Sequence, residues 1–257
     1  MVAGVAAADA VARARRMPAL GVGLHLVLTR GKPVLDPAKI PALVEANGVF
    51  AGDLFRAGVN FFFNPAARAQ LEAEIRAQFE AFKRTGLCLD HVNGHNHIHL
   101  HPTVLSLVLK VGRDYGLPAV RVPYEPPLLS FAAMKEGFWR RLLPALGLWP
   151  WTALLKRRIR RAGLTCNDRV FGIFDTGHMT APRVAGFIAR LPAGVSEIYL
   201  HPAVGGGGNP DLAAEGYDGP GELAALLDGS IARTIREGGI AAVTFSDLGG
   251  KAPAAAS

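Results

Sequence analysis

The sequence predicts an α/β fold with a mostly parallel sheet, because two hydrophobic periods alternate along the chain. Short apolar runs rich in β-branched residues are followed by longer amphipathic stretches, a pattern typical of parallel strands covered by helices. The chain has 257 residues, a length that a single α/β domain often reaches. We therefore expect one domain over residues 1–250 and a flexible tail at 251–257.

Turn and capping residues place each element in order along the chain. Apolar runs bounded by glycine, proline or polar clusters give the expected strands Gly21–Leu28, Leu87–Val92, Ala119–Pro123, Val170–Phe174, Glu197–His201 and Ala241–Phe245. Amphipathic stretches give the expected helices Ala6–Met17, Ala66–Arg84, Val104–Tyr115, Pro182–Leu191 and Gly221–Glu237. Asn64 and Pro65 provide a cap and a first-turn proline for the helix that starts at Ala66, and Gly86 ends it.

Two segments interrupt this alternation, an insertion at 125–168 and a glycine-rich loop at 203–219. Eight basic residues and one acidic residue lie between Lys135 and Arg161, which accounts for the net charge of +7. With its tryptophans and leucines, the segment 135–161 fits an amphipathic element that contacts anionic lipid or a lipid-linked sugar. A pair of solvated helices that covers the sheet fits the same pattern equally well.

The composition also excludes several classes of protein. No apolar run is long enough to span a membrane, and no basic segment precedes an apolar export signal. Cys88 and Cys166 do not form a metal-binding or disulfide pattern. The basic residues accompany no nucleic-acid recognition motif. We expect a cytoplasmic protein, with membrane association through 135–161 and a homodimer left open, and no nucleic acid partner.

The strongest chemical signal is a cluster of histidines. Five of the eight histidines lie within eleven residues, at His91, His95, His97, His99 and His101. Imidazole binds metals and exchanges protons near neutral pH. The cluster follows the apolar run of a predicted strand, and in parallel α/β folds the carboxyl ends of the strands carry the functional side chains.

Two more histidines lie at the ends of predicted strands. His25 is the single polar side chain in Gly21–Leu28, and His201 ends the strand that starts at Glu197. An isolated histidine of this kind is more often a satisfied core residue. Three histidine sites at three strand ends instead predict a shared metal and acid–base centre.

These residues resemble a known family. The motifs Gly-Val-Gly-Leu-His25, His91-Val-Asn93-Gly-His95-Asn-His97-Ile-His99, Val-Arg121 and Leu-His201-Pro-Ala are similar to those of the YdjC-like carbohydrate deacetylases, with the hopanoid-biosynthesis (HpnK) branch favoured. The resemblance implies a deformed (β/α) barrel of the polysaccharide-deacetylase type. It also implies hydrolysis of the N-acetyl group of an amino sugar or glycolipid, including a hopanoid-linked glycoside, with one divalent metal ion, Mg or Zn.

The resemblance assigns roles to individual residues. His25 and His95 correspond to metal ligands, and His201 corresponds to the acid that protonates the leaving amine. The remaining residues of the motifs are expected to contact the substrate or to orient the ligands, namely Asn93, His97, His99 and Arg121. His91 and His101 are expected to be structural, because histidines that pack in a loop are satisfied without metal.

One departure from the family pattern affects the predicted chemistry. The first strand of the family carries two adjacent aspartates, a metal ligand and a base, and this chain contains no Asp-Asp pair. Asp175, near another predicted strand end, maps to neither. The first residues match the family near its second strand, so we expect an N-terminally truncated barrel that lacks its first strand. The alternative is a catalytically inactive, histidine-rich homologue that binds metal or membrane.

Overall fold

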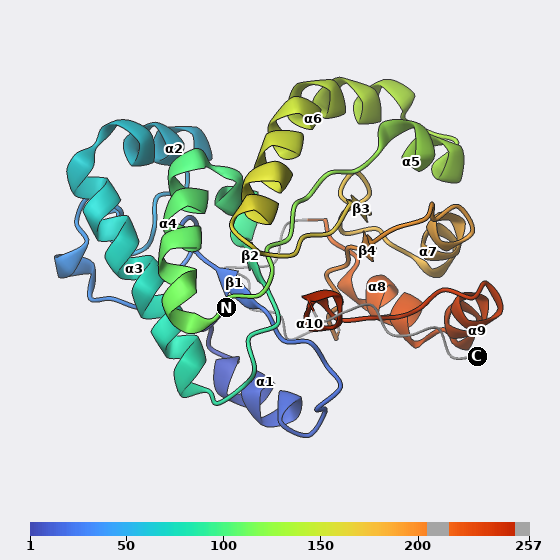
Figure 1. Cartoon of the computed structure of the whole chain (residues 1–257), viewed down its shortest axis with the longest axis horizontal. Coiled ribbons are helices and arrows are strands. Elements are labelled where there is room, and N and C mark those ends of the chain that lie inside the picture. Colours follow the sequence, from blue (N-terminus) through green and yellow to red (C-terminus); the bar gives the residue numbers. More distant parts are fainter. Residues whose placement is uncertain (205–215, 250–257) are drawn as a thin grey trace. The chain divides into compact units, whose positions relative to one another are not determined.

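The computed structural model describes residues 1–204 and 216–249, so the predicted tail and the middle of the glycine-rich loop lie outside the described residues. Contacts within the chain divide it into two compact units (Figure 1). The first comprises Met1–Arg121, Arg158–Cys166 and Thr244–Ser257, and the second comprises Val122–Arg157 and Asn167–Val243. One domain over 1–250 stays a prediction.

Both units mix helices with short strands, which confirms the predicted α/β class. The first unit contains α1 (Ala7–Ala14), β1 (Leu24–Leu26), η1 (Pro37–Lys39), α2 (Leu54–Phe63), α3 (Pro65–Arg84), β2 (Val92–Gly94), η2 (His95–Leu100), α4 (Pro102–Gly112), η3 (Arg113–Tyr115) and α10 (Phe245–Gly249). The second contains α5 (Pro127–Met134), most of α6 (Phe138–Arg161), β3 (Arg169–Phe171), α7 (Ala181–Ile188), β4 (Ser196–Ile198), α8 (Gly219–Leu227) and α9 (Gly229–Glu237).

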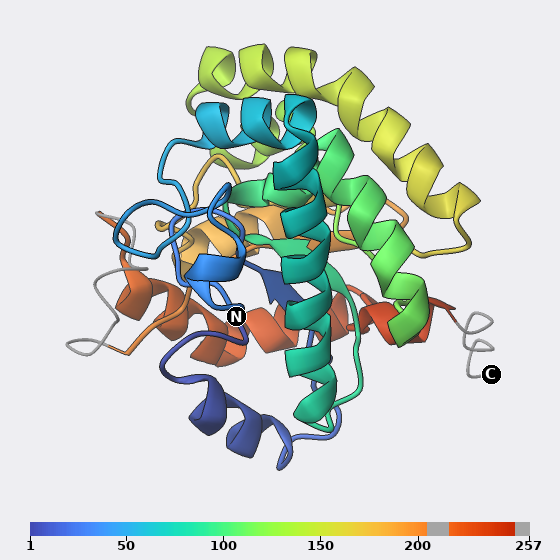
Figure 2. The same ribbon diagram turned by 90° about the vertical axis from the view of Figure 1, so that its left-hand side faces the viewer.

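Parallel pairing organises the strands, as the sequence predicted. In the first unit β1 pairs with β2 in parallel, with His25 opposite Asn93. Two further parallel bridges extend this ladder through residues 119–120 to residue 165. In the second unit β3 pairs with β4, again in parallel. In the first unit α3 packs against β1 and α4, and Figure 2 shows α3 and α4 side by side.

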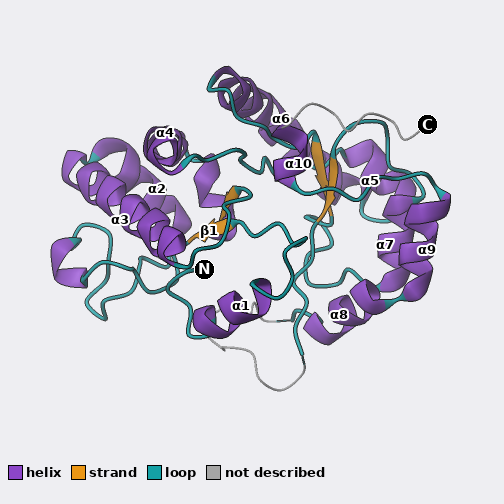
Figure 3. Ribbon diagram, turned by 60° about the horizontal axis from the view of Figure 1, so that its bottom comes forward, coloured by secondary structure: helices purple, strands orange, loops and turns teal. Residues whose placement is uncertain are grey.

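The strands are shorter than predicted (Figure 3), and the expected strand Ala119–Pro123 forms only isolated bridges. At two positions, buried side-chain amides bind backbone groups that could otherwise pair with a neighbouring strand. The Gln78 amide accepts a hydrogen bond from the Val27 N–H at 3.0 Å and donates one to the Val27 carbonyl at 2.7 Å. In the second unit the Asn167 amide bonds the N–H and the carbonyl of Val122 in the same way, at 2.8 and 3.0 Å. Regular pairing therefore stops at both positions.

The predicted start of α3 is confirmed. The Asn64 side chain accepts hydrogen bonds from the N–H groups of Ala66 and Ala67, and Pro65 occupies the first turn. The helix before it, α2, was not predicted. Asp53 caps α2 through the N–H groups of its first turn, and α2 ends at Asn64, so one residue ends one helix and caps the next.

The expected helix Gly221–Glu237 is wrong as a continuous element. It is divided into α8 and α9 at Asp228, whose backbone is extended and whose carboxylate accepts a hydrogen bond from the Ser230 N–H at 2.8 Å. Aspartate at this position satisfies a helix N-terminus better than a helix interior, so the break follows from the local chemistry.

The expected strand Ala241–Phe245 is also wrong. Residues 241–244 have no regular structure, and Phe245 begins α10. The Asp90 carboxylate accepts a hydrogen bond from the Ser246 N–H at 2.8 Å. This carboxylate binds a donor at the start of α10, which stabilises a helix start there instead of a strand.

The insertion at 125–168 folds into α5 and α6, with Pro144 and Pro150 inside α6. The side chain of Arg141, also on α6, is completely buried. Among the residues that the structure describes, no helix is both long enough and apolar enough to cross a membrane.

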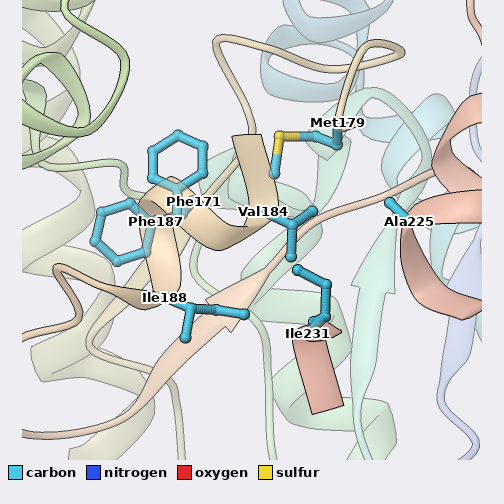
Figure 4. Packing of buried hydrophobic residues seen from close by; sticks show 7 residues of the cluster. All are labelled: Phe171, Met179, Val184, Phe187, Ile188, Ala225 and Ile231. Atoms are coloured by element: carbon cyan, nitrogen blue, oxygen red, sulfur yellow. The ribbon is translucent and has the colours of Figure 1, made fainter. Parts of the chain in front are cut away.

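The second unit has its own hydrophobic core between β3 and the helices α7, α8 and α9. Figure 4 shows its seven buried members, Phe171, Met179, Val184, Phe187, Ile188, Ala225 and Ile231. The rings of Phe171 and Phe187 lie 5.2 Å apart between centroids. This core fixes β3, after which the segment 172–179 leads to α7.

We expect Gln78→Leu to destabilise the protein by about 3 kcal/mol, because it leaves two buried backbone groups of Val27 without partners. Gln70→Leu is the matched control on the same helix, since it removes one hydrogen bond, from the Ala42 N–H, at a partly buried site, and should cost about 1 kcal/mol. Urea unfolding of the three proteins measures both values. Equal costs for the two variants would contradict this role of Gln78.

Candidate functional site

The register of β1 and β2 places His25 beside Asn93. The Nδ1 of His25 lies 2.6 Å from the Oδ1 of Asn93. Because this oxygen can only accept, Nδ1 carries the proton and donates it, and the other ring nitrogen, Nε2, keeps its lone pair. Neighbours on either side of His25, Leu24 and Leu26, are completely buried, which fixes the strand and the direction of the histidine.

His95 follows β2 directly and lies next to His25. Their rings meet edge to face with centroids 5.8 Å apart. Two imidazoles that share a tetrahedral zinc ion have ring centroids about 5 Å apart, given zinc–nitrogen distances of about 2 Å. The observed spacing of 5.8 Å between the two rings is close to this value.

His25 is neutral at physiological pH. Burial is the largest cause that lowers its pKa, to about 3, and the hydrogen bond to Asn93 opposes this effect. The positive charges of the N-terminus, His95 and Arg121 lower the pKa further. A neutral imidazole is the form that binds metal.

The chain turns sharply after His95. Asn96 and His97 both have left-handed backbones, with φ of 50° and 56°. Each such residue costs about 1 kcal/mol relative to a right-handed conformation. Strain of this kind is commonly kept where it positions functional side chains, and here it reverses the chain directly after the metal-ligand candidate.

His99 lies within the same group of residues. It is completely buried, and its Nε2 donates a hydrogen bond to the Arg121 carbonyl at 2.9 Å. Its ring centroid is 6.2 Å from that of His97. Burial, and then the charge of His97, lower the pKa of His99 to about 3. Within the described residues its Nδ1 has no hydrogen-bond partner.

Arg121 is close to this group, because its charge lowers the pKa of both His25 and His99. The structure thus gathers six predicted site residues in the first unit, namely His25, Asn93, His95, His97, His99 and Arg121.

The other two histidines of the cluster, His91 and His101, make further contacts. The Nδ1 of His91 donates to the Asp90 carboxylate at 2.8 Å, its Nε2 lies 3.3 Å from the side-chain nitrogen of Asn93, and its ring packs at a tilt against Phe245 with centroids 4.7 Å apart. The ring of His101 packs against Phe61 and Phe62.

The described residues gather no group of three histidine, cysteine, aspartate or glutamate side chains that could hold a metal ion. The His25–His95 pair would supply at most two ligands, whereas a catalytic zinc site commonly uses three protein ligands and one open position.

His201 lies in the second unit, just after β4. Its Nδ1 is 3.3 Å from the Thr176 hydroxyl, which in turn is 3.2 Å from the Tyr217 hydroxyl. The buried Glu222 carboxylate accepts hydrogen bonds from the N–H groups of His201 and Met179. Both the backbone and the ring of His201 are thus fixed by neighbouring side chains.

Asp175 is engaged in ion pairs and is completely buried. Its two carboxylate oxygens bind the Arg141 guanidinium at 2.7 and 2.8 Å, and one of them also binds Arg183 at 2.7 Å. Arg141 further donates to Ser130 at 2.6 Å. These ion pairs hold the Asp175 carboxylate in place, and with it the segment that precedes Thr176.

The sequence reasoning missed the residues that support the histidines, above all Asp90, Thr176 and Glu222. One signal was present in the sequence. Gly21 and Gly23 leave no room for a Cβ, because such an atom would lie 2.8 Å from the Asp90 carboxyl carbon and 2.5 Å from the His91 ring. The Gly-x-Gly spacing therefore marks the positions of Asp90 and His91.

The chain has relatives among named proteins. The chain is 41% identical over 115 residues to a protein of Brevibacillus brevis named carbohydrate deacetylase, with 45% of this chain and 43% of that protein covered. It thus spans less than half the length of that relative. It is 30% identical over 276 residues to a mouse protein of the same name, with 96% of this chain and 84% of that protein covered.

A similar fold is known from a crystal structure. It belongs to a protein of Enterococcus faecalis described provisionally as a cellobiose-phosphate cleavage protein, with a TM-score of 0.66, 21% sequence identity, and coverage of 93% of this chain and 82% of that chain. The sequence model of the family described as YdjC-like protein matches residues 1–237. Since this match includes the histidine motifs of both units, the chain belongs to the YdjC-like protein family.

Proposed function

We propose that this protein is a metal-dependent deacetylase that hydrolyses the N-acetyl group of an amino sugar. The observation that carries the proposal is the His25–His95 pair. The His25 imidazole is neutral with its lone pair on Nε2, and the centroids of the two rings are 5.8 Å apart. The chain belongs to a family with relatives named carbohydrate deacetylase, which supports the substrate class.

The residues divide the chemistry between them. His25 and His95 would hold one divalent ion, Mg or Zn, and the bound ion would activate water toward the amide carbonyl. By the resemblance, His201 of the second unit would give a proton to the amine nitrogen as the C–N bond breaks, which releases acetate and the free amino sugar. Asn93 orients His25. His97, His99 and Arg121 are proposed to contact the sugar or to position the ligands.

The proposed site requires a carboxylate as a further ligand. The resemblance implies an aspartate from an Asp-Asp pair on a further strand of a deformed (β/α) barrel, and no such pair occurs in the 257 residues. Translating the DNA directly upstream of Met1 in the same frame is the decisive observation. An Asp-Asp-Phe-Gly-like segment favours the deacetylase, and an in-frame stop favours the inactive, histidine-rich alternative.

The second candidate property is peripheral contact with an anionic membrane or a glycolipid, including a hopanoid-linked glycoside. Apolar side chains along α6 are exposed, with Trp139 at 66%, Leu143 at 62% and Trp149 at 57%. Four exposed arginines follow at the end of the same helix, Arg157, Arg158, Arg160 and Arg161. Aromatic and basic side chains in this order are typical of elements at lipid headgroups.

We expect His95→Ala to abolish metal-dependent release of acetate from an N-acetylglucosaminide, because one imidazole cannot replace two ligands. His201→Gln should lower kcat by about 100-fold or more, the usual contribution of a general acid. The assay uses the chain and the chain extended by its in-frame upstream codons. His178→Gln, at an exposed histidine, is the control. Unchanged kcat in His201→Gln would remove His201 from the mechanism.

For membrane contact, we expect the protein to sediment with anionic vesicles at low salt and to be released at high salt. Each engaged basic side chain contributes about 1 kcal/mol near an anionic surface. Replacing Arg157, Arg158, Arg160 and Arg161 by Gln should abolish sedimentation. The charge-matched control replaces four exposed basic residues of the first unit by Gln, Arg16, Lys39, Arg68 and Arg84. Equal losses in the two variants would show that net charge, and not α6, determines binding.

A further inference from the structure

A chain of hydrogen bonds runs from Asp90 to His25 across the β1–β2 pair. The Asp90 carboxylate accepts from the Nδ1 of His91 at 2.8 Å. The Nε2 of His91 accepts from the side-chain amide nitrogen of Asn93 at 3.3 Å. The Oδ1 of Asn93 accepts from the Nδ1 of His25 at 2.6 Å. With His91 in its neutral form, one arrangement of protons satisfies every donor and acceptor along this chain.

The chain starts at a group that can only accept. Burial opposes ionisation of Asp90, but hydrogen bonds from His91 and Ser246 outweigh it, so the pKa of this carboxyl lies below its ordinary value. The Asp90 side chain is 4% exposed, and the Ser246 N–H holds its other oxygen at 2.8 Å. An ionised carboxylate in this position requires a proton on the Nδ1 of His91.

An amide side chain alone cannot determine which ring nitrogen of a histidine carries the proton. Asn93 offers an oxygen on one side and an NH₂ group on the other, and rotating the amide by half a turn exchanges an acceptor for a donor. Neutral His91 with its proton on Nδ1 removes this ambiguity, because its Nε2 can then only accept and binds the NH₂ group of Asn93. The oxygen of Asn93 must then face His25.

The fold makes room for this chain at two glycines. A Cβ on Gly21 would lie 2.8 Å from the Asp90 carboxyl carbon, and one on Gly23 would lie 2.5 Å from the His91 ring. The His91 ring also packs against Phe245, with centroids 4.7 Å apart. The ring of His91 is thus held in one plane between β1 and the start of α10.

We infer that Asp90 and His91 are positioning residues that set the ring tautomer of His25 through the side-chain amide of Asn93. They keep the proton on Nδ1 and the lone pair on Nε2, the nitrogen that would bind a metal ion. That last use rests on the proposed function. The tautomer itself is a property of the metal-free chain.

The test is the tautomer ratio of His25, measured by long-range proton–nitrogen correlation NMR on the metal-free, full-length chain near neutral pH. His25→Gln identifies the signals of His25. The Nδ1–H form should predominate in the parent protein. His91→Phe keeps a ring between Gly23 and Phe245 but removes the acceptor for Asn93, and should lower the ratio of Nδ1–H to Nε2–H by about tenfold.

A rescue variant distinguishes a positioning role of His91 from a packing role. Asn93→Asp in the His91→Phe background should restore the Nδ1–H form, because a carboxylate facing His25 can only accept. An unchanged ratio in His91→Phe, or no restoration in the double variant, would overturn the inference.

A second variant acts without altering the ring. In Asp90→Asn the Ser246 N–H still requires an oxygen, so the new NH₂ group faces His91 and should reverse every donor in the chain. His25 should then be mainly in the Nε2–H form, and persistence of the Nδ1–H form would contradict the inference. Neither readout needs metal or turnover, so failure to find deacetylase activity would count against the proposed function alone.

Discussion

The parallel register between β1 and β2 is the constraint on which the histidine site depends. Side chains alternate between the two faces of a strand, so a shift of one residue would turn every side chain to the opposite face. Leu24 and Leu26 are completely buried, and their burial prevents such a shift. His25 is thereby held opposite Asn93, and the metal-ligand candidate His95 begins the turn just beyond.

In the second unit, buried carboxylates hold the segments around His201 in place. The segment between β3 and α7 has little regular structure, yet Asp175 and Glu222 fix it from within through Arg141 and through backbone N–H groups. A buried carboxylate is costly unless its hydrogen bonds are satisfied, and both carboxylates meet this condition. The ring of His201 consequently has defined neighbours even though it follows the short strand β4.

The sequence predicted the histidines of the site better than it predicted the residues that hold them in place. Histidines at the ends of apolar runs are a local pattern, and the capping residues of α3 are local as well. The contact between Asp90 and Ser246 joins residues 156 positions apart, and no local sequence pattern at either residue predicts it. α2 was missed for a different reason. Phe55 and Phe63 are exposed at 81% and 72% while Phe61 is buried, so apolar side chains on both faces hide the helical period.

The side-chain amides that end the strands also limit how the sheets can associate. An unpaired strand edge offers its N–H and carbonyl groups to any passing chain, which is the usual start of aggregation. Gln78 binds the N–H and the carbonyl of Val27, and Asn167 binds the same two groups of Val122. Both amides lie inside the protein. The N–H group of a backbone position satisfied in this way is no longer available to a foreign strand. Two buried amides thus protect short sheets that have few strands of their own.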